Sequence, residues 1–298
     1  MIAVLVALAL LILLALATLL FLVPWAIARR LTRVLPRTYW DTYTYTPWEM
    51  GIEFQEVCFP SGDGLSLSGW LLPRPETDRV IILASGYRGR KSELLGACGY
   101  LWRQGFSVFA LDLRGQGESQ QERYLTMGYR EVQDVLAAVD YVCLRIPGAR
   151  VGVLGYSMGA AVAVMAAARD PRIRVVVADG GFAFQKDIIA HNFTQVTHLP
   201  PWPFVDLAEW WVERRAGFRP SWVCPADEIG KIAPRPVLII HGVEDDLVPV
   251  EQARTLYRRA GDPKELWLLE GAKHAGAYFV DRKAYCQRIA GFFERWLA

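Results

Sequence analysis

A short strand that turns into a helix through Gly155-Tyr156-Ser157-Met158-Gly159 constrains this sequence more than any other feature. The apolar residues 151–154 favour a strand, and the alanine-rich residues 160–169 favour a helix. The turn must hold Ser157 in a sparsely populated backbone conformation, and the two glycines remove side chains that would keep strand and helix apart. The pattern predicts a sharp turn with an exposed serine hydroxyl. The simpler interpretation is that Ser157 only caps the helix.

A serine hydroxyl becomes a nucleophile when a histidine takes its proton and a carboxylate orients that histidine. Of the four histidines, His274 lies in a glycine-bounded loop between an apolar strand and the C-terminal helix. Asp245 lies among three adjacent acids in the loop that follows another apolar strand. Ser157, Asp245 and His274 therefore occur in the order serine, acid, histidine. Asp179, at the end of an earlier strand, is the alternative acid.

Short apolar segments alternate with segments of helical length over residues 52–298, which are enough for one α/β domain. The expected strands are residues 80–84, 108–111, 151–154, 173–178, 237–240 and 266–269. The expected helices are residues 91–104, 128–146, 157–169, 206–215 and 251–260. This alternation predicts a mostly parallel central sheet that is flanked by helices.

Four further motifs are similar to those of the α/β-hydrolase superfamily, in its branch of single-domain serine esterases and peptidase-like hydrolases. Residues 61–72 resemble its opening hairpin, and Ser85-Gly-Tyr-Arg-Gly89 resembles the His-Gly-x-x-Gly oxyanion loop. Asp112-Leu-Arg-Gly-Gln-Gly-Glu-Ser119 resembles Asp-x-Arg-Gly-x-Gly-x-Ser. His241-Gly-Val-Glu-Asp-Asp-Leu-Val-Pro249 resembles its acid motif. The resemblance covers residues 52–298.

The resemblance implies a catalytic triad and an oxyanion hole. Ser157 is the nucleophile, His274 the base and Asp245 the acid, and the backbone N–H groups of Tyr87 and Met158 hold the oxyanion. Ser85 departs from the pattern where many relatives carry histidine, but that side chain is not an oxyanion donor. This chemistry requires no metal and no cofactor.

The N-terminus carries a second strong signal, because residues 1–28 contain no charged side chain. At 1.5 Å per residue such a helix crosses a hydrocarbon core of about 30 Å. We expect a transmembrane anchor and a lipid bilayer as its partner. A cleaved signal peptide is the alternative, with Ala15-Leu16-Ala17 as the cleavage site. The absence of a basic start and the length of the apolar stretch favour the anchor.

Charge after the apolar stretch predicts the orientation. Arg29, Arg30, Arg33 and Arg37 follow it with no acid between them, so the positive-inside rule places the catalytic domain in the cytoplasm. Five cysteines without a Cys-x-x-Cys pair fit a reducing compartment.

Two aromatic segments flank the expected domain core. Residues 29–51 form a basic and aromatic linker, whose Trp40, Tyr43, Tyr45 and Trp48 either lie at headgroup level or pack onto the first strands. Residues 182–233 form a crossover and cover segment rich in phenylalanine and tryptophan. Its aromatic side chains either pack against the sheet or line an acyl pocket.

The expected function is acyl transfer to water from a small-molecule ester, with an apolar or lipid-derived acyl group favoured by the anchor. A prolyl-oligopeptidase-like peptidase and an acyltransferase use the same triad and remain alternatives. A catalytically inactive fold that serves as a membrane-tethered interaction module is the non-enzymatic alternative. No nucleic-acid partner is expected, and the sequence does not determine the oligomeric state.

Overall fold

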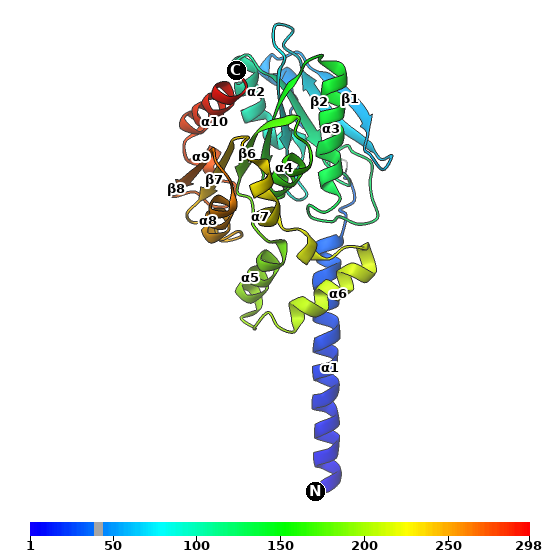
Figure 1. Cartoon of the computed structure of the whole chain (residues 1–298). Coiled ribbons are helices and arrows are strands. Elements are labelled where there is room, and N and C mark those ends of the chain that lie inside the picture. Colours follow the sequence, from blue (N-terminus) through cyan, green and yellow to red (C-terminus); the bar gives the residue numbers. More distant parts are fainter. Residues whose placement is uncertain (39–43) are drawn as a thin grey trace.

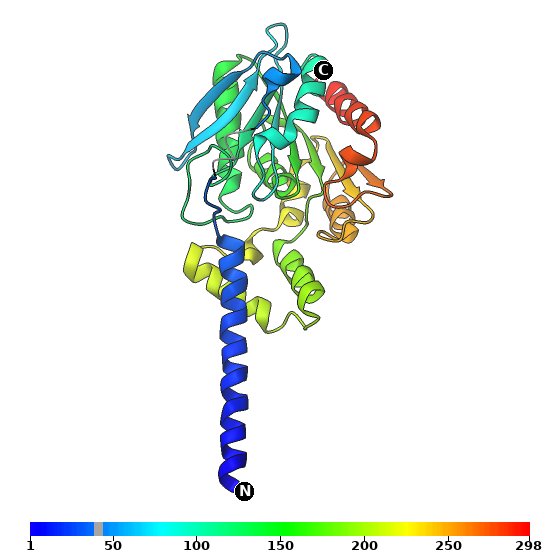
Figure 2. The ribbon, with the colours of Figure 1, turned by 180° about the vertical axis from the view of Figure 1, so that it is seen from behind.

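The long N-terminal helix α1 (Ile2–Thr32) projects from a layered α/β domain in the computed structural model, which describes residues 1–38 and 44–298. Figures 1 and 2 show that the first two thirds of α1 extend away from the domain, whereas its C-terminal part lies against it. The helix is unbroken through Ala15-Leu16-Ala17 and continues past residue 28. It is the one described helix long and apolar enough to cross a membrane.

The domain is built on an eight-stranded sheet in the order β1-β2-β4-β3-β5-β6-β7-β8. Strand β2 runs antiparallel to β1 and β4, and strands β3 to β8 run parallel to one another. The strands are β1 (Gln55–Pro60), β2 (Ser66–Leu72), β3 (Arg79–Ala84), β4 (Ser107–Asp112), β5 (Arg150–Tyr156), β6 (Ile173–Asp179), β7 (Val237–Gly242) and β8 (Lys264–Leu269). The predicted α/β fold with a mostly parallel sheet is confirmed.

Helices cover both faces of the sheet (Figure 1). They are α2 (Leu95–Arg103), α3 (Glu131–Arg145), α4 (Met158–Arg169), α5 (Gln185–Thr197), α6 (Phe204–Ala216), α7 (Pro225–Glu228), α8 (Val250–Arg259), α9 (Ala277–Val280) and α10 (Arg282–Trp296). Because neighbouring side chains of a strand point to opposite faces, Val176 joins the core under α3 and α4, whereas Val175 and Val177 join the core under α2 and α10.

The C-terminal part of α1 packs against α5 and α6. Ile189, Phe193, Phe204 and Val205 form a buried cluster that is covered by Val23, Ile27 and Leu31 of α1. The rings of Phe21 and Trp211 meet edge to face at 5.1 Å, and the Arg215 guanidinium donates to the Thr32 hydroxyl at 3.0 Å. The buried aromatic side chains of the cover segment therefore divide between two partners, because Phe182 and Phe218 belong instead to the sheet core.

The predicted linker contains a 3-10 helix, η2 (Pro47–Met50), which packs against α2 through the Arg103 guanidinium and the Met50 carbonyl. Helix α2 lies near the C-terminus, at the end of the domain remote from the projecting part of α1 (Figure 1). Tyr45 and Trp48 are each 75% exposed, so they do not pack onto the first strands. Trp40 and Tyr43 lie outside the described residues.

Candidate active site

Ser157 sits in a sharp turn between β5 and α4. Its backbone has φ 53° and ψ −116°, in a region that L-residues rarely occupy, and its N–H donates to the Asp179 carbonyl at 2.7 Å. A Cβ at Gly155 would lie 2.1 Å from the Gly159 carbonyl oxygen, and a Cβ at Gly159 would lie 2.3 Å from the Ala84 carbonyl oxygen. Glycine is therefore a steric requirement at both positions, as the sequence pattern indicates.

His274 lies between Ser157 and Asp245. Its Nε2 is 2.8 Å from Ser157 Oγ, and its Nδ1 is 2.8 Å from Asp245 Oδ2. The backbone N–H groups of Leu247 and Val248 donate to Asp245 Oδ1 at 3.0 and 2.8 Å. Both carboxylate oxygens of Asp245 thus have donors, so the carboxylate is fixed in position to hold the imidazole.

A second histidine, His241, lies under the same carboxylate. Its Nε2 is 2.7 Å from the Val248 carbonyl oxygen and 3.3 Å from Asp245 Oδ2. Burial lowers the pKa of His241, which keeps the ring neutral with its proton on Nε2, where it donates to the carbonyl. His241 therefore supports the loop that carries Asp245 and does not face the serine.

The alternative acid, Asp179, has other partners. The Tyr285 hydroxyl donates to Asp179 Oδ2 at 2.9 Å and lies 3.1 Å from the Tyr156 hydroxyl. Asp179 is 1% exposed, and burial raises its pKa to about 7. Since the imidazole Nδ1 of His274 is bonded to Asp245, the structure brings Asp245 and not Asp179 to the histidine.

The two expected oxyanion donors flank Ser157. The loop after β3 passes so close that a Cβ on Gly86 would be 3.3 Å from Ser157 Cβ, and Tyr87 follows directly. Met158 is the first residue of α4, and the first N–H groups of a helix have no intrahelical acceptor. An anion beside Ser157 would also be favoured by the N-terminal end of the α4 dipole.

The side chains of this loop bind the end of α1, which the sequence did not predict. The Tyr87 hydroxyl donates to the Leu31 carbonyl at 2.9 Å and lies 3.2 Å from the Arg30 carbonyl oxygen. The Arg88 guanidinium donates to the Arg30 and Arg33 carbonyls at 3.0 Å each. Burial raises the pKa of Tyr87 to about 12, so its hydroxyl keeps its proton at neutral pH.

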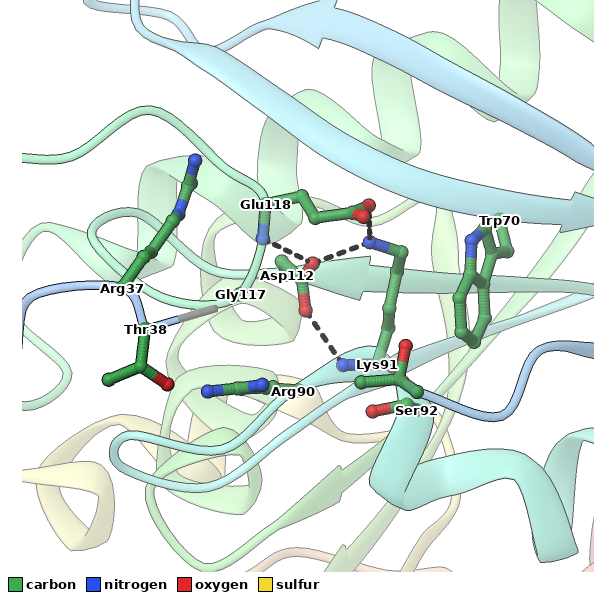
Figure 3. A pocket seen from close by; sticks show the side chains of 10 residues that line it. Arg37, Thr38, Trp70, Arg90, Lys91, Ser92, Asp112, Gly117 and Glu118 are labelled. Atoms are coloured by element: carbon green, nitrogen blue, oxygen red, sulfur yellow. Dashed lines mark hydrogen bonds and ion pairs between the residues drawn. The ribbon is translucent and has the colours of Figure 1, made fainter. Parts of the chain in front are cut away.

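A polar pocket of about 240 Å³ lies beside the same loop but contains no triad residue (Figure 3). Inside it the buried Lys91 ammonium contacts Asp112 Oδ2 at 2.6 Å and Glu118 Oε2 at 2.5 Å, and the Lys91 N–H donates to Asp112 Oδ1 at 2.7 Å. The Glu118 N–H also donates to Asp112 at 2.9 Å. Asp112 thus braces the end of β4 against the segment that follows the Tyr87 loop.

Strands β3 and β5 to β8 are parallel, so the loops after their carboxyl ends meet at one edge of the sheet. Tyr87, Ser157, Asp179, Asp245 and His274 all come from these loops or strand ends. Among the described residues, no group of three histidine, cysteine or acidic side chains forms a metal site. A serine, a histidine and a carboxylate in hydrogen-bonded sequence at this edge form the arrangement that serine hydrolases with an α/β sheet use.

Comparison with known proteins gives the same class. A family model described as serine aminopeptidase, S33, matches residues 75–217. The uncharacterized protein YqkD of Bacillus subtilis is 28% identical over 238 residues, which cover 79% of this chain and 77% of that protein. The uncharacterized protein YfhR of Escherichia coli is 28% identical over 249 residues, which cover 80% of this chain and 78% of that protein.

The solved structures include an esterase of this fold. The Pyrococcus furiosus esterase Pf2001 superposes with a TM-score of 0.75 at 28% identity, over 90% of this chain and 99% of that chain. The protein described here has the α/β-hydrolase fold and is similar to esterases of that fold. Its family model and structural relatives support a hydrolase of esterase type.

Proposed function

We propose that this protein is a membrane-anchored serine hydrolase that cleaves carboxylic esters through an acyl-enzyme intermediate. One observation carries the proposal: the His274 ring lies 2.8 Å from both Ser157 Oγ and Asp245 Oδ2. This geometry allows a proton to pass from the hydroxyl to the imidazole, while the carboxylate stabilises the imidazolium that forms.

Each step follows from an atom of this site. Ser157 Oγ attacks the ester carbonyl carbon, and His274 Nε2 takes the hydroxyl proton. The carbonyl oxygen becomes negative and accepts hydrogen bonds from the N–H groups of Tyr87 and Met158. When the intermediate collapses, the C–O bond to the alcohol breaks, and the alcohol leaves with the proton from His274. Water, activated by the same imidazole, then attacks the acyl-enzyme and releases the carboxylic acid and Ser157.

An ester is the proposed substrate because the Pyrococcus furiosus relative is described as an esterase and matches over most of both chains. The matching family model, described as a serine aminopeptidase, favours an amide substrate as the second candidate. The two candidates differ in the leaving group, so competing ester and aminoacyl-amide substrates of the same acyl group separate them by their kcat/KM values.

Covalent labelling tests the nucleophile directly. A fluorophosphonate probe should label the full chain in detergent, and Ser157→Ala should abolish labelling, whereas the exposed-serine control Ser66→Ala should label normally. A well-folded native chain without labelling would contradict the proposal and favour an inactive interaction module. A series of p-nitrophenyl esters should then show preference for acyl chains beyond about eight carbons, because each buried methylene contributes about 0.8 kcal/mol.

We further propose that α1 is a retained anchor and that the domain faces the cytoplasm. The four arginines between residues 29 and 37 support this orientation. The length of the apolar stretch and the absence of a basic start support retention. External protease should leave the domain intact in right-side-out vesicles and digest it in inverted vesicles. An N-terminus beginning near Thr18 in the mature protein would instead indicate signal-peptide cleavage.

A further inference from the structure

The connection between α5 and α6 has an unusual surface. Residues 188–205 contain no Asp, Glu, Lys or Arg, although such residues make up 21% of the chain. Within this stretch the last turn of α5 exposes Val196 by 78%, and the connection that follows exposes Leu199 by 39% and Trp202 by 74%. We name residues 196–203 the apolar tip. Exposed apolar groups gathered without charges mark a surface that binds a partner.

The position of the apolar tip relative to α1 indicates the partner. Residues 1–22 of α1 are all exposed, and the packing of α1 against the domain lies C-terminal to them, apart from the contact of Phe21 with Trp211. A helix from residue 2 to residue 22 is about 30 Å long at 1.5 Å per residue, which matches the hydrocarbon thickness of a bilayer. The bilayer boundary therefore falls close to the level at which Phe21 meets Trp211 of α6.

Figures 1 and 2 both show the α5–α6 connection as the part of the domain that extends furthest along α1 toward its N-terminus. If α1 spans the bilayer, the apolar tip reaches the headgroup region of the same leaflet. Trp210, which is 43% exposed on α6, lies one residue from the ring that contacts Phe21. Tryptophan is enriched at this depth because its ring is apolar and its N–H is polar.

The catalytic edge of the sheet faces the same way. Tyr87 follows the carboxyl end of β3 and binds the last turn of α1, and Ser157 follows the carboxyl end of the parallel strand β5. Helix α5 extends from this edge to the apolar tip, and its Asn192 side chain donates to the Leu247 carbonyl at 3.0 Å, within the loop that carries Asp245. The elements around Ser157 thus continue into the surface that adjoins the bilayer.

We propose that the apolar tip and Trp210 insert into the headgroup region of the leaflet next to the domain, so that α1 and the α5–α6 pair form a two-point membrane attachment. Resting on the proposed function, the attachment gives Ser157 access to esters that partition into the bilayer. The partner is the lipid surface itself, since the apolar tip carries no Asp, Glu, Lys or Arg that would select a charged protein.

Quenching by brominated lipid tests the attachment without turnover. The full chain is reconstituted in phosphatidylcholine vesicles with and without bromine on the acyl chains, and the tryptophan emission lost to bromine is measured. Trp202→Phe and Trp210→Phe should each reduce the amount of quenched emission. The control Trp296→Phe, 38% exposed at the C-terminal end of α10 and remote from α1 in Figure 1, should leave it unchanged. Equal quenched emission in all three variants and the native chain would overturn the proposal.

A second measurement separates the attachment from catalysis. Trp202→Glu places a charge in the apolar tip, and we expect at least a fivefold loss of hydrolysis of a long-chain ester embedded in the vesicles. Hydrolysis of water-soluble p-nitrophenyl acetate should be unchanged. Equal rates of Trp202→Glu and native chain on the embedded ester would also overturn the attachment. Absence of fluorophosphonate labelling in the native chain would instead contradict only the hydrolase proposal, because quenching by brominated lipid does not depend on catalysis.

Discussion

The Tyr87 hydroxyl donates a hydrogen bond of 2.9 Å to the backbone carbonyl of Leu31. The last carbonyls of a helix have no intrahelical donor, and here the loop beside the serine supplies donors from Tyr87 and Arg88. The end of α1 and the loop that carries a proposed oxyanion donor therefore stabilise each other. Arg88 has φ 61°, so the loop holds a left-handed residue next to this contact.

Tyr87→Phe should weaken oxyanion binding, because the loop loses the hydrogen bond to Leu31 that positions it. The backbone N–H of residue 87, the proposed donor, is still present in this variant. The lost hydrogen bond is worth about 1 kcal/mol, so we expect kcat to fall about fivefold with little change in KM. The affinity of a boronate inhibitor, which forms a tetrahedral adduct with Ser157, should fall by a similar factor. Tyr45→Phe, at an exposed tyrosine, is the control. A lower thermal midpoint with unchanged kcat and boronate affinity would give Tyr87 a purely structural role.

Replacing the two acids separately should distinguish their roles. Asp245→Asn removes the acceptor of His274 Nδ1–H and favours the wrong tautomer, for which a loss of about 10⁴ in kcat is expected. Asp179→Asn should change kcat less than tenfold, because Asp179 is bonded to Tyr285. Steady-state kinetics of the purified chain on one p-nitrophenyl ester measures both. The opposite order of losses would make Asp179 the acid.

Asp179 should make the stability depend on pH. Burial raises its pKa in the folded protein to about 7 from an ordinary value of 3.8. Between these values the folded state binds a proton that the unfolded state has lost, so stability falls as pH rises and levels off above about pH 7. The difference between pH 4 and pH 8 is at most about 4 kcal/mol. Urea unfolding of the native chain should show this slope, and Asp179→Asn should reduce it, because the buried Asp134, whose pKa burial also raises to about 7, keeps its own contribution. If stability changes with pH by the same amount in the native chain and in Asp179→Asn, Asp179 is ionised in the folded protein.

Gly159→Ala should unfold or severely destabilise the protein, because the new Cβ would lie 2.3 Å from the Ala84 carbonyl oxygen and 2.5 Å from the Ser85 carbonyl oxygen. We expect a loss of about 3 kcal/mol or more. The control is Gly291→Ala inside α10, where nothing lies within 4 Å and alanine should stabilise the helix by up to about 1 kcal/mol. Thermal unfolding followed by circular dichroism measures both. Equal midpoints for the two variants would mean that the turn tolerates a side chain.

The sequence was sufficient for the parallel strands of the sheet but not for the edge strand β1, and it singled out the candidate site residues. Buried parallel strands are continuous apolar runs, so residues 80–84 and 237–240 could be predicted as strands from their own residues, without knowledge of the neighbouring strands. The turn at Ser157 could be predicted from Gly155 and Gly159, because the close approach of strand and helix leaves no room for a side chain at either position. Asp245 and His274 were found by chain order, and the structure brings their side chains together with Ser157. Their catalytic roles remain predictions.

The partners of the cover segment could not be predicted. Ile189 and Phe193 have the spacing of one helix face whether they pack on the sheet, line a pocket or cover α1, since a hydrophobic face does not specify what it meets. Contact with Val23 and Ile27 joins segments that are far apart in the sequence. The hydrogen bond from Tyr87 to Leu31 could not be predicted either, because the sequence around Gly86 and Tyr87 does not indicate where the tyrosine hydroxyl points.

The covering of Phe193 and Phe204 by the end of α1 has a practical consequence for handling this protein. Deletion of residues 1–33, a routine step toward a soluble version, would remove the carbonyls that Tyr87 binds. It would also expose the apolar cluster around Phe193 and Phe204, which would then be prone to aggregation. Truncation near residue 22 would keep both contacts while discarding the most lipophilic stretch. Preparations that differ only in where they begin should therefore differ in solubility and in activity.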